Sequence, residues 1–313
     1  MPVYLAKRLL AAIPILFLVA VFIFSLAHLT PGDPAVLLAG DNATPAQVEA
    51  IRARLRLDEP LHIQFALWLA DAVRLDLGTS IYSNQPVTRL IGQRVEPTFV
   101  LAAVTLCLTV AIAVPLGVIA AWRANSLLDR AIMGLAVIGF SVPVFVIGYM
   151  LIYVFAVQLR WFPVQGYKPL SDGVLTTLHS VALPSFALAL VFAALIARVT
   201  RAAMLDALNQ NHIRTARAKG LGTVRILIVH ALKNVGVPVI TVIGIGLATL
   251  IGGVVVTESV FNIPGIGRLT VDAITRRDYP VLQGVILFFS ATLILVNILV
   301  DLSYAWFDPR VKG

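Results

Sequence analysis

Six long apolar stretches run through this chain of 313 residues, and none of them contains an Asp, Glu, Lys or Arg. They cover residues 9–29, 98–122, 131–159, 181–197, 234–257 and 280–300. An apolar helix of about 20 residues spans the hydrocarbon core of a bilayer, so these stretches predict membrane-spanning helices. The composition agrees, because 59% of the residues are hydrophobic and only 13% are charged.

The lack of charge within the stretches also restricts the function. Pumps and ion-coupled carriers need ionisable groups at membrane depth to move protons or ions. A chain without such groups is not expected to drive transport by itself. We therefore expect another protein to supply its energy.

The basic residues predict the orientation of the chain. Lys and Arg gather on short segments beside the spans, as the positive-inside rule requires if the N-terminus is cytoplasmic. The net charge of +8 is thus a topology signal rather than a nucleic-acid footprint. We predict an all-α integral membrane protein with both termini inside (N-in/C-in) and six transmembrane helices, at about 9–29, 98–122, 131–159, 181–203, 234–257 and 280–304.

Five of the stretches are interrupted by proline, at Pro14, Pro115, Pro143, Pro184 and Pro238. Proline removes a backbone donor, and such breaks are tolerated where neighbouring helices or a cavity satisfy the backbone again. Close helix packing and a lined pathway both agree with this pattern.

The outer segment 30–97 is too long for a simple turn and is expected to be helical. The helix breakers Thr30 to Pro34 end the first span. Thr44 then resembles an N-cap, with Pro45 at the first helical position and Gln47 completing a capping box. A second amphipathic stretch begins at Leu61. The loop is either a structural cap or a docking platform for an extracytoplasmic partner.

The largest inner segment, 200–233, predicts a short helix within 209–222. Asn209 or Asn211 can cap its start, and Gly220 can take the left-handed conformation that ends it. Arg217 and Lys219 place positive charge on its last turn. Such a helix, joined to a span on each side, can transmit movement from a bound partner to both spans. The alternative is a solvated basic loop that anchors the topology.

Several sequence motifs resemble those of binding-protein-dependent ABC importers, in the form seen in dipeptide and oligopeptide permeases. The motifs are Thr30-Pro31-Gly32-Asp33-Pro34, Asp76-Leu77-Gly78-Thr79-Ser80, Ser141-Val142-Pro143-Val144-Phe145, Arg214-Thr215-Ala216-Arg217-Ala218-Lys219-Gly220, and Glu258 to Leu269 with Arg277-Asp278-Tyr279-Pro280. The resemblance covers nearly the whole chain. One departure is that Arg214-Thr215-Ala216 stands where importers at large have Glu-Ala-Ala, so a glutamate contact cannot be carried over from them.

This resemblance implies that residues 1–313 form one transmembrane domain, a permease subunit in the bacterial inner membrane that lines half of a pathway. Its implied partners are a second homologous permease, two ATPase subunits and an extracytoplasmic solute-binding protein. No cofactor is implied in this chain, because ATP and Mg²⁺ belong to the ATPases. Peptides are the implied substrate, with glutathione, nickel complexes or other small solutes as alternatives. The coupling helix would comprise Ile213, Arg214, Thr215, Ala216, Arg217, Ala218, Lys219, Gly220 and Leu221.

The outer segment from Glu258 to Leu269 is expected to be ordered. Pro264, Gly265 and Gly267 allow a sharp re-entrant turn, and several apolar residues between them favour burial. We expect a role in gating or packing at the outer mouth for Glu258, Phe261, Pro264, Gly265 and Gly267. A simple turn at the end of a span is the alternative.

Three other classes of protein are alternatives to an importer subunit. The sequence has no Gly-x-x-x-x-Gly-Lys-Ser/Thr phosphate loop, so the chain is not expected to hydrolyse ATP, and no His-Glu-x-x-His metal motif that would indicate an intramembrane enzyme. The five histidines fall at span ends or in loops, where an interfacial polar role is expected. A secondary carrier of an uncharged solute remains the other alternative, and it would transport without ATP or partners.

Overall fold

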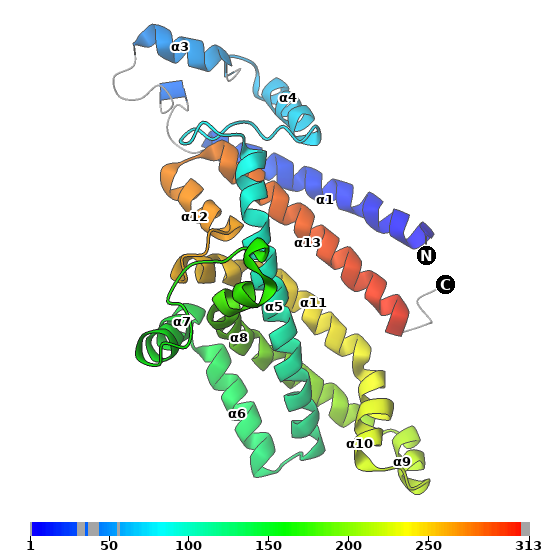
Figure 1. Ribbon diagram of the computed structural model, residues 1–313. Coiled ribbons are helices and arrows are strands. Elements are labelled where there is room, and N and C mark those ends of the chain that lie inside the picture. The colour runs from blue at the N-terminus through cyan, green and yellow to red at the C-terminus, as the bar shows by residue number, and fades with distance from the viewer. Residues whose placement is uncertain (1, 30–34, 37–43, 55–56, 308–313) are drawn as a thin grey trace. The chain divides into compact units, whose positions relative to one another are not determined.

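The computed structural model describes residues 2–29, 35–36, 44–54 and 57–307, and their regular structure is helical apart from one isolated bridge between Thr79 and Pro86. The α-helices (Figure 1) are α1 (Pro2–Leu29), α3 (Pro45–Arg54), α4 (Leu61–Val73), α5 (Val87–Trp122), α6 (Leu127–Ser141), α7 (Val144–Leu151), α8 (Val174–Leu208), α9 (Asn211–Ala218), α10 (Thr223–Arg225), α11 (Gly236–Val260), α12 (Ile266–Arg276) and α13 (Tyr279–Phe307). Two π-helical segments, η1 (Ile152–Gln158) and η3 (Ile226–Ala231), and two 3₁₀ segments, η2 (Leu170–Asp172) and η4 (Leu232–Val235), complete the set. The predicted all-α class is confirmed.

Four described helical segments are long and apolar enough to cross a membrane: Val87–Trp122, Val174–Leu208, Thr223–Val260 and Tyr279–Ser303. They contain the apolar stretches predicted as the second, fourth and fifth spans and most of the sixth. A fifth crossing is present if the bent pair of α6 with α7 and η1 counts as one span. The apolar section of α1, Leu10–Ser25, is shorter than these helices.

The third apolar stretch does not form the single helix predicted over 131–159. It is divided into α6 and the α7–η1 helix, and the two are bent by 101°. Val142 between them is extended, with φ −89° and ψ 127°. The next residue, Pro143, has no backbone N–H and disfavours a helical conformation at the residue before it, so the helix breaks here.

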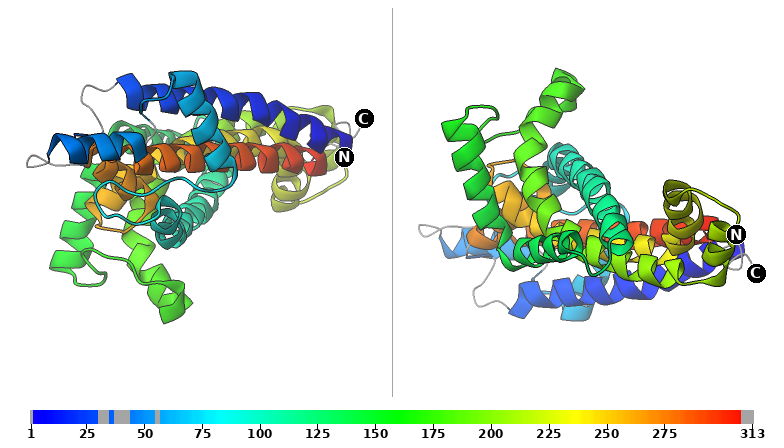
Figure 2. Two further views of the ribbon diagram at one scale, coloured as in Figure 1. Left: turned by 90° about the horizontal axis from the view of Figure 1, so that it is seen from above. Right: turned by 90° about the horizontal axis from the view of Figure 1, so that it is seen from below.

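The chain divides into two compact units, residues 1–93 with 269–294 and residues 94–268 with 295–313. In the second unit, α8 lies beside α6, α7 and α11 (Figure 1, Figure 2). One buried cluster joins α5, α7, α8 and α11 through residues such as Leu101, Leu188 and Val254. Another joins the C-terminal ends of α5 and α8 to α9 and η3. Since α8 contributes to both clusters and also lies beside α6, α7 and α11, it is the central helix of this unit.

In the first unit, the helices α3 and α4 form where the sequence predicts them. The N–H of Thr44 donates to Oε1 of Gln47 (2.8 Å), and the N–H of Gln47 donates to the Thr44 hydroxyl (3.4 Å), which confirms the capping box at the start of α3. Phe65 of α4 packs edge-on against Phe24 of α1, with ring centroids 5.3 Å apart. The helix breakers Thr30 to Pro34 lie outside the described residues.

Candidate functional site

The short helix α9 is held by one buried face. Ile213 has no exposed surface and Ala216 is 5% exposed, and their spacing of three residues places them on the same side of the helix. They share a buried cluster with Met204 and Ala207 near the end of α8 and with Ala121 at the end of α5. Burial of an isoleucine side chain stabilises a fold by about 1.5–3 kcal/mol, so α9 is fixed firmly to α8.

The end of α9 is a Schellman motif. The N–H of Leu221 donates to the carbonyl of Ala216 (3.2 Å), and the N–H of Gly220 donates to the carbonyl of Arg217 (2.9 Å). Gly220 has φ +78°, the left-handed conformation expected for it from the sequence. Leu221 then turns back onto the same cluster as Ala216.

The start of α9 differs from the prediction that Asn209 or Asn211 would cap it. Gln210 is the N-cap residue, and it makes no side-chain hydrogen bond to the helix. Asn209 still has the helical conformation that ends α8, and Asn211 is already the first residue of α9. The connection between the two helices is too short for either asparagine to adopt the extended cap conformation.

The other face of α9 carries charge to the surface. Arg214, Thr215, Arg217, Ala218 and Lys219 are all exposed. Among the residues that the structure describes, neither Arg214, Arg217 nor Lys219 forms an ion pair. These three cations can therefore bind an acidic or polar surface of another protein without first breaking a contact within the chain.

Asn234 connects α9 to the following span. Its Nδ2 donates to the carbonyl oxygen of His230 and lies 3.0 Å from Nε2 of His212 on α9. It belongs to η4, which follows the π-helical η3. Such irregular helical turns often mark a functional hinge. A movement of α9 thus has a short polar route into the helix that continues to Val260.

The segment 258–269 folds around buried apolar residues. Val260, Phe261, Ile263 and Ile266 are all buried, as their sequence predicts. The ring of Phe261 packs on Gly148 of α7, which has no side chain. A Cβ added to Gly148 would lie 3.1 Å from the Phe261 ring. The Phe261 carbonyl accepts a hydrogen bond from the N–H of Gly166 (2.9 Å). Pro264, in contrast, is exposed and provides only the turn.

Glu258 is a carboxylate with no exposed surface at the end of α11. Its Oε1 accepts a hydrogen bond from the Thr98 hydroxyl (2.6 Å), and its Oε2 accepts one from the N–H of Arg268 (2.9 Å). Thr98 also accepts from the N–H of Ile266 (2.8 Å). Glu258 and Thr98 together therefore bind free N–H groups of the first turn of α12, whose dipole favours a negative charge there.

Two predicted glycines make this contact possible. A Cβ on Gly265 would stand 1.9 Å from Oε1 of Glu258, and a Cβ on Gly267 would stand 2.6 Å from Cα of Val255. Glycine at both positions lets the start of α12 approach α11 closely. The structure thus brings Glu258, Gly265 and Gly267 together in one arrangement.

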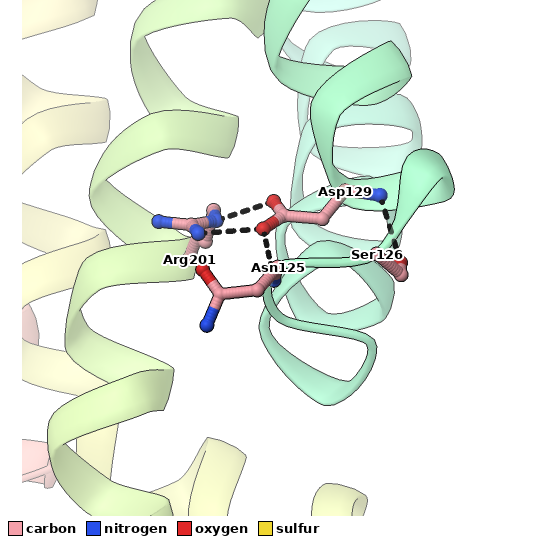
Figure 3. A network of polar contacts seen from close by, with 4 residues as sticks. All are labelled: Asn125, Ser126, Asp129 and Arg201. Atoms are coloured by element: carbon pink, nitrogen blue, oxygen red, sulfur yellow. Dashed lines mark hydrogen bonds and ion pairs between the residues drawn. The ribbon is translucent and has the colours of Figure 1, made fainter.

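Three polar pairs were missed by sequence reasoning. The first joins Asp129 at the start of α6 to Arg201 of α8, which donates from Nε to Oδ1 (2.6 Å) and from Nη2 to Oδ2 (2.7 Å), as Figure 3 shows. The spacing of Ser126 and Asp129 is that of a capping box, and it could have placed Asp129 in the first turn of a helix. No local pattern indicates its partner, which is 72 residues away.

The second pair joins Tyr167 to Glu96 near the start of α5. The Tyr167 hydroxyl donates to Oε1 of Glu96 (2.8 Å), and the N–H of Leu170 donates to the same oxygen (2.7 Å). Burial, and then the hydrogen bond to Glu96, raise the pKa of Tyr167 above its usual value. The tyrosine therefore stays protonated and remains a donor.

The third pair lies in the first unit and connects two of the sequence motifs. Asp278, just before α13, accepts a hydrogen bond from the Ser80 hydroxyl and another from the N–H of Ile81 (3.1 Å). Arg276 covers the ring of Tyr82, with its guanidinium carbon 4.0 Å from the ring centroid. The motif that contains Ser80 is thus fixed to the junction of α12 and α13.

Metal ligands do not cluster in the described part of the chain, where no three His, Cys, Asp or Glu side chains are placed to hold an ion. The polar groups described above bind one another or face the surface. Two candidate sites result, the basic helix α9 and the close contact of Glu258 with the start of α12.

Known families match the chain along almost all of its length. Residues 113–313 match the family "Binding-protein-dependent transport system inner membrane component". Residues 1–102 match the family "Binding-prot-dependent transport system membrane comp, N-term". The two matches leave only a short part of α5 between them.

Individual proteins give the same result. The chain is 49% identical to the "Probable peptide ABC transporter permease protein y4tP" of Sinorhizobium fredii, over 100% of both chains. It is 44% identical to the "Glutathione transport system permease protein GsiC" of Pectobacterium atrosepticum, over 99% of this chain and 98% of that one. A solved structure of the MetNI methionine ABC transporter in an inward-facing conformation has a similar fold, with a TM-score of 0.59 and 18% identity over 70% of this chain and 96% of that chain.

Proposed function

Because the chain belongs to the family of binding-protein-dependent transport system inner membrane components, we propose that it imports peptides or similar small solutes as one subunit of an ATP-driven complex. The full-length similarity to peptide and glutathione permeases carries this proposal. The chain is a multi-pass inner-membrane permease component of an ABC importer. It is not an enzyme, since ATP hydrolysis in this family resides in partner subunits.

The proposed topology has six transmembrane helices, with both termini in the cytoplasm. The four long apolar helices, the bent pair and α1 would supply the six crossings. The positive-inside rule supports this orientation, because it places the basic residues of α9 in the cytoplasm. Segment 30–97 would then lie outside, as a helical loop that either caps the spans or receives a binding protein.

The proposed partners are a second homologous permease, two ATPase subunits and an extracytoplasmic solute-binding protein. We assign residues 213–221 as the coupling helix that contacts an ATPase. Support comes from its exposed cations and from the buried Ile213 and Ala216, which fix the helix to α8. This chain would hold no cofactor, since ATP and Mg²⁺ would bind to the ATPases.

The outer segment around Glu258 would close or pack the outer mouth of the pathway. Support comes from the way in which Glu258, Gly265 and Gly267 bring the start of α12 against α11, while Phe261 fills the space at Gly148. Pro264 contributes the turn. We expect the segment to move together with the end of α11, to which these contacts join it.

Peptides are the first substrate class to test, because the relative from Sinorhizobium fredii is named as a peptide permease. Glutathione, itself a tripeptide, is the second candidate and is favoured by the name of the relative from Pectobacterium atrosepticum. Nickel complexes and other small solutes have no such support.

The test is reconstitution of the complete complex in proteoliposomes with its binding protein. We expect uptake of labelled peptides that requires ATP and stops when the ATPase subunits cannot hydrolyse it. Labelled glutathione in a parallel experiment would decide between the two substrates. Uptake by this chain alone without ATP would contradict the proposal and indicate a secondary carrier.

A further inference from the structure

The contact between Asp129 and Arg201 is built more fully than a surface ion pair. The Arg201 guanidinium binds both carboxylate oxygens, and the N–H of Asn125 donates to Oδ2 as a third bond (2.9 Å). The Ser126 hydroxyl accepts from the N–H of Asp129 and fixes the turn that carries it (Figure 3). The Asp129 side chain is only 4% exposed, and that of Arg201 is 25% exposed. Two-bond geometry of this kind fixes orientation as well as distance.

Arg201 lies about two turns of helix before the end of α8, next to the part of α8 that carries α9. Met204 and Ala207 of that part pack against Ile213 and Ala216 of α9. The buried cluster thus fixes α9 to the end of α8, while the ion pair fixes α8 to the start of α6. The cluster and the ion pair thus link the three elements through α8.

A buried ion pair is weak evidence for stability, because the cost of removing two charges from water offsets their attraction. The contribution of this ion pair is therefore better explained by the relative orientation that it imposes on α6 and α8. The same segment of α8 could have packed on α6 with apolar side chains, which would permit sliding. A two-bond contact between a planar guanidinium and a carboxylate does not permit it.

We propose that Asp129 and Arg201 are positioning residues that make α6, the end of α8 and α9 move as one body. Movement of α9 against an ATPase then reaches α6 directly, as well as the spans that continue from α8 and α10. This inference rests on the proposed coupling role of α9. It adds a second route from that helix into the membrane, through a helix that is remote from it in sequence.

The first measurement is the distance between spin labels on cysteines placed at Leu127 and Asn211, in a Cys107→Ala background of the complete complex. Leu127 is the first residue of α6 and Asn211 the first of α9, and both are exposed. We expect one narrow distance distribution that is the same with and without ATP. In Arg201→Gln we expect it to broaden and to change with nucleotide. An equally narrow, unchanged distribution in Arg201→Gln would overturn the proposal.

The second measurement compares solute transported with ATP hydrolysed. We expect Arg201→Gln to keep its ATPase subunits during purification but to lose at least tenfold in solute transported per ATP. Arg198→Gln is the matched control, because this substitution removes the same charge from the same helix. Arg198 is exposed and has no described partner. The control variant should behave as the wild type. A wild-type ratio in Arg201→Gln would refute the link.

Further variants separate this role from a merely structural one. Asp129→Asn with Arg201→Gln leaves no buried charge unpaired and should assemble as the single variant does, without recovering the transport ratio. Arg201→Lys keeps the charge, loses the two-bond contact and should give an intermediate ratio. A double variant with a wild-type ratio would show that the pair only stabilises the fold. The spin-label distances need no solute, so failure of the peptide assignment would leave them interpretable.

Discussion

Thr98 links Glu258 to the start of α12, because its hydroxyl group both donates and accepts. It donates to Glu258 and accepts from the N–H of Ile266, and all three groups are buried. A buried polar group that loses its partner costs about 1–3 kcal/mol. One hydroxyl therefore decides whether the carboxylate and the start of α12 are both satisfied.

Thr98→Val should accordingly destabilise the purified complex by about 1–3 kcal/mol, seen as a lower midpoint of thermal unfolding. The matched control is Thr105→Val on the same helix. The Thr105 hydroxyl is buried, and within the described residues it has no hydrogen-bond partner. Its removal should leave the midpoint unchanged or raise it. Equal effects of the two substitutions would contradict the assigned role of Thr98.

Asp278 has the corresponding role in the first unit. Asp278→Ala removes both hydrogen bonds that hold Ser80 and Ile81, so the segment 76–86 should be cut faster by added protease. Asp272→Ala is the control, because Asp272 belongs to α12 and has no described partner. Cleavage of the Asp278→Ala complex at the control rate would show that other contacts hold the segment.

At the scale of one element, α9 is defined by how it ends rather than by how it begins. Its start has no side-chain cap, whereas its end has both bonds of the Schellman motif and a left-handed glycine. A Cβ on Gly220 would meet nothing within 4 Å. A larger residue at position 220 therefore meets no steric clash, and only the left-handed backbone conformation opposes it. If that conformation is lost, the chain leaves α9 in a different direction.

Gly220→Val should reduce ATP-dependent uptake by roughly tenfold, since a left-handed conformation costs a residue with a side chain about 1–2 kcal/mol. Gly220→Asn should be tolerated, because asparagine adopts this conformation more readily. Arg217→Glu should instead weaken recruitment of the ATPase subunits, as it reverses the charge at the contact. The measurements are uptake, ATP hydrolysis and copurification of the ATPases. Normal values for both Gly220→Val and Arg217→Glu would return this segment to a solvated basic loop.

At the scale of the whole molecule, the topology is the property that labelling tests most directly. Single cysteines at Asn211 and Leu127, in a Cys107→Ala background, should react with an impermeant reagent only from the cytoplasmic side. A cysteine at Asp58 should react only from outside. All three positions are exposed. Reversed labelling at any of them would contradict the six-span, N-in/C-in arrangement.

Local patterns predicted much of this molecule. The length of the apolar stretches located the long helices, and the capping box at Thr44 and the end of α9 at Gly220 follow from a few neighbouring residues. The bend at Pro143 was indicated only as an interruption. Its angle of 101° depends on how α7 packs and is not encoded in the proline alone.

The polar contacts between helices could not be predicted in the same way. Thr98 and Glu258 are 160 residues apart, and Ser80 and Asp278 are 198 apart. Each residue by itself has an ordinary local explanation, such as a turn or a helix end. Only the packing of the helices brings the pairs together, and periodicity along one chain carries no information about that packing.

The close approach of Gly265 to Glu258 has a consequence for how sequences of this kind can diverge. The place of the missing methyl group at position 265 is occupied by the carboxylate of residue 258. A lineage that acquired alanine at 265 would have to shorten or withdraw the acid at 258, and a lineage with a shorter acid would be released from the need for glycine. The two positions should therefore change as a pair, although six residues of chain lie between them.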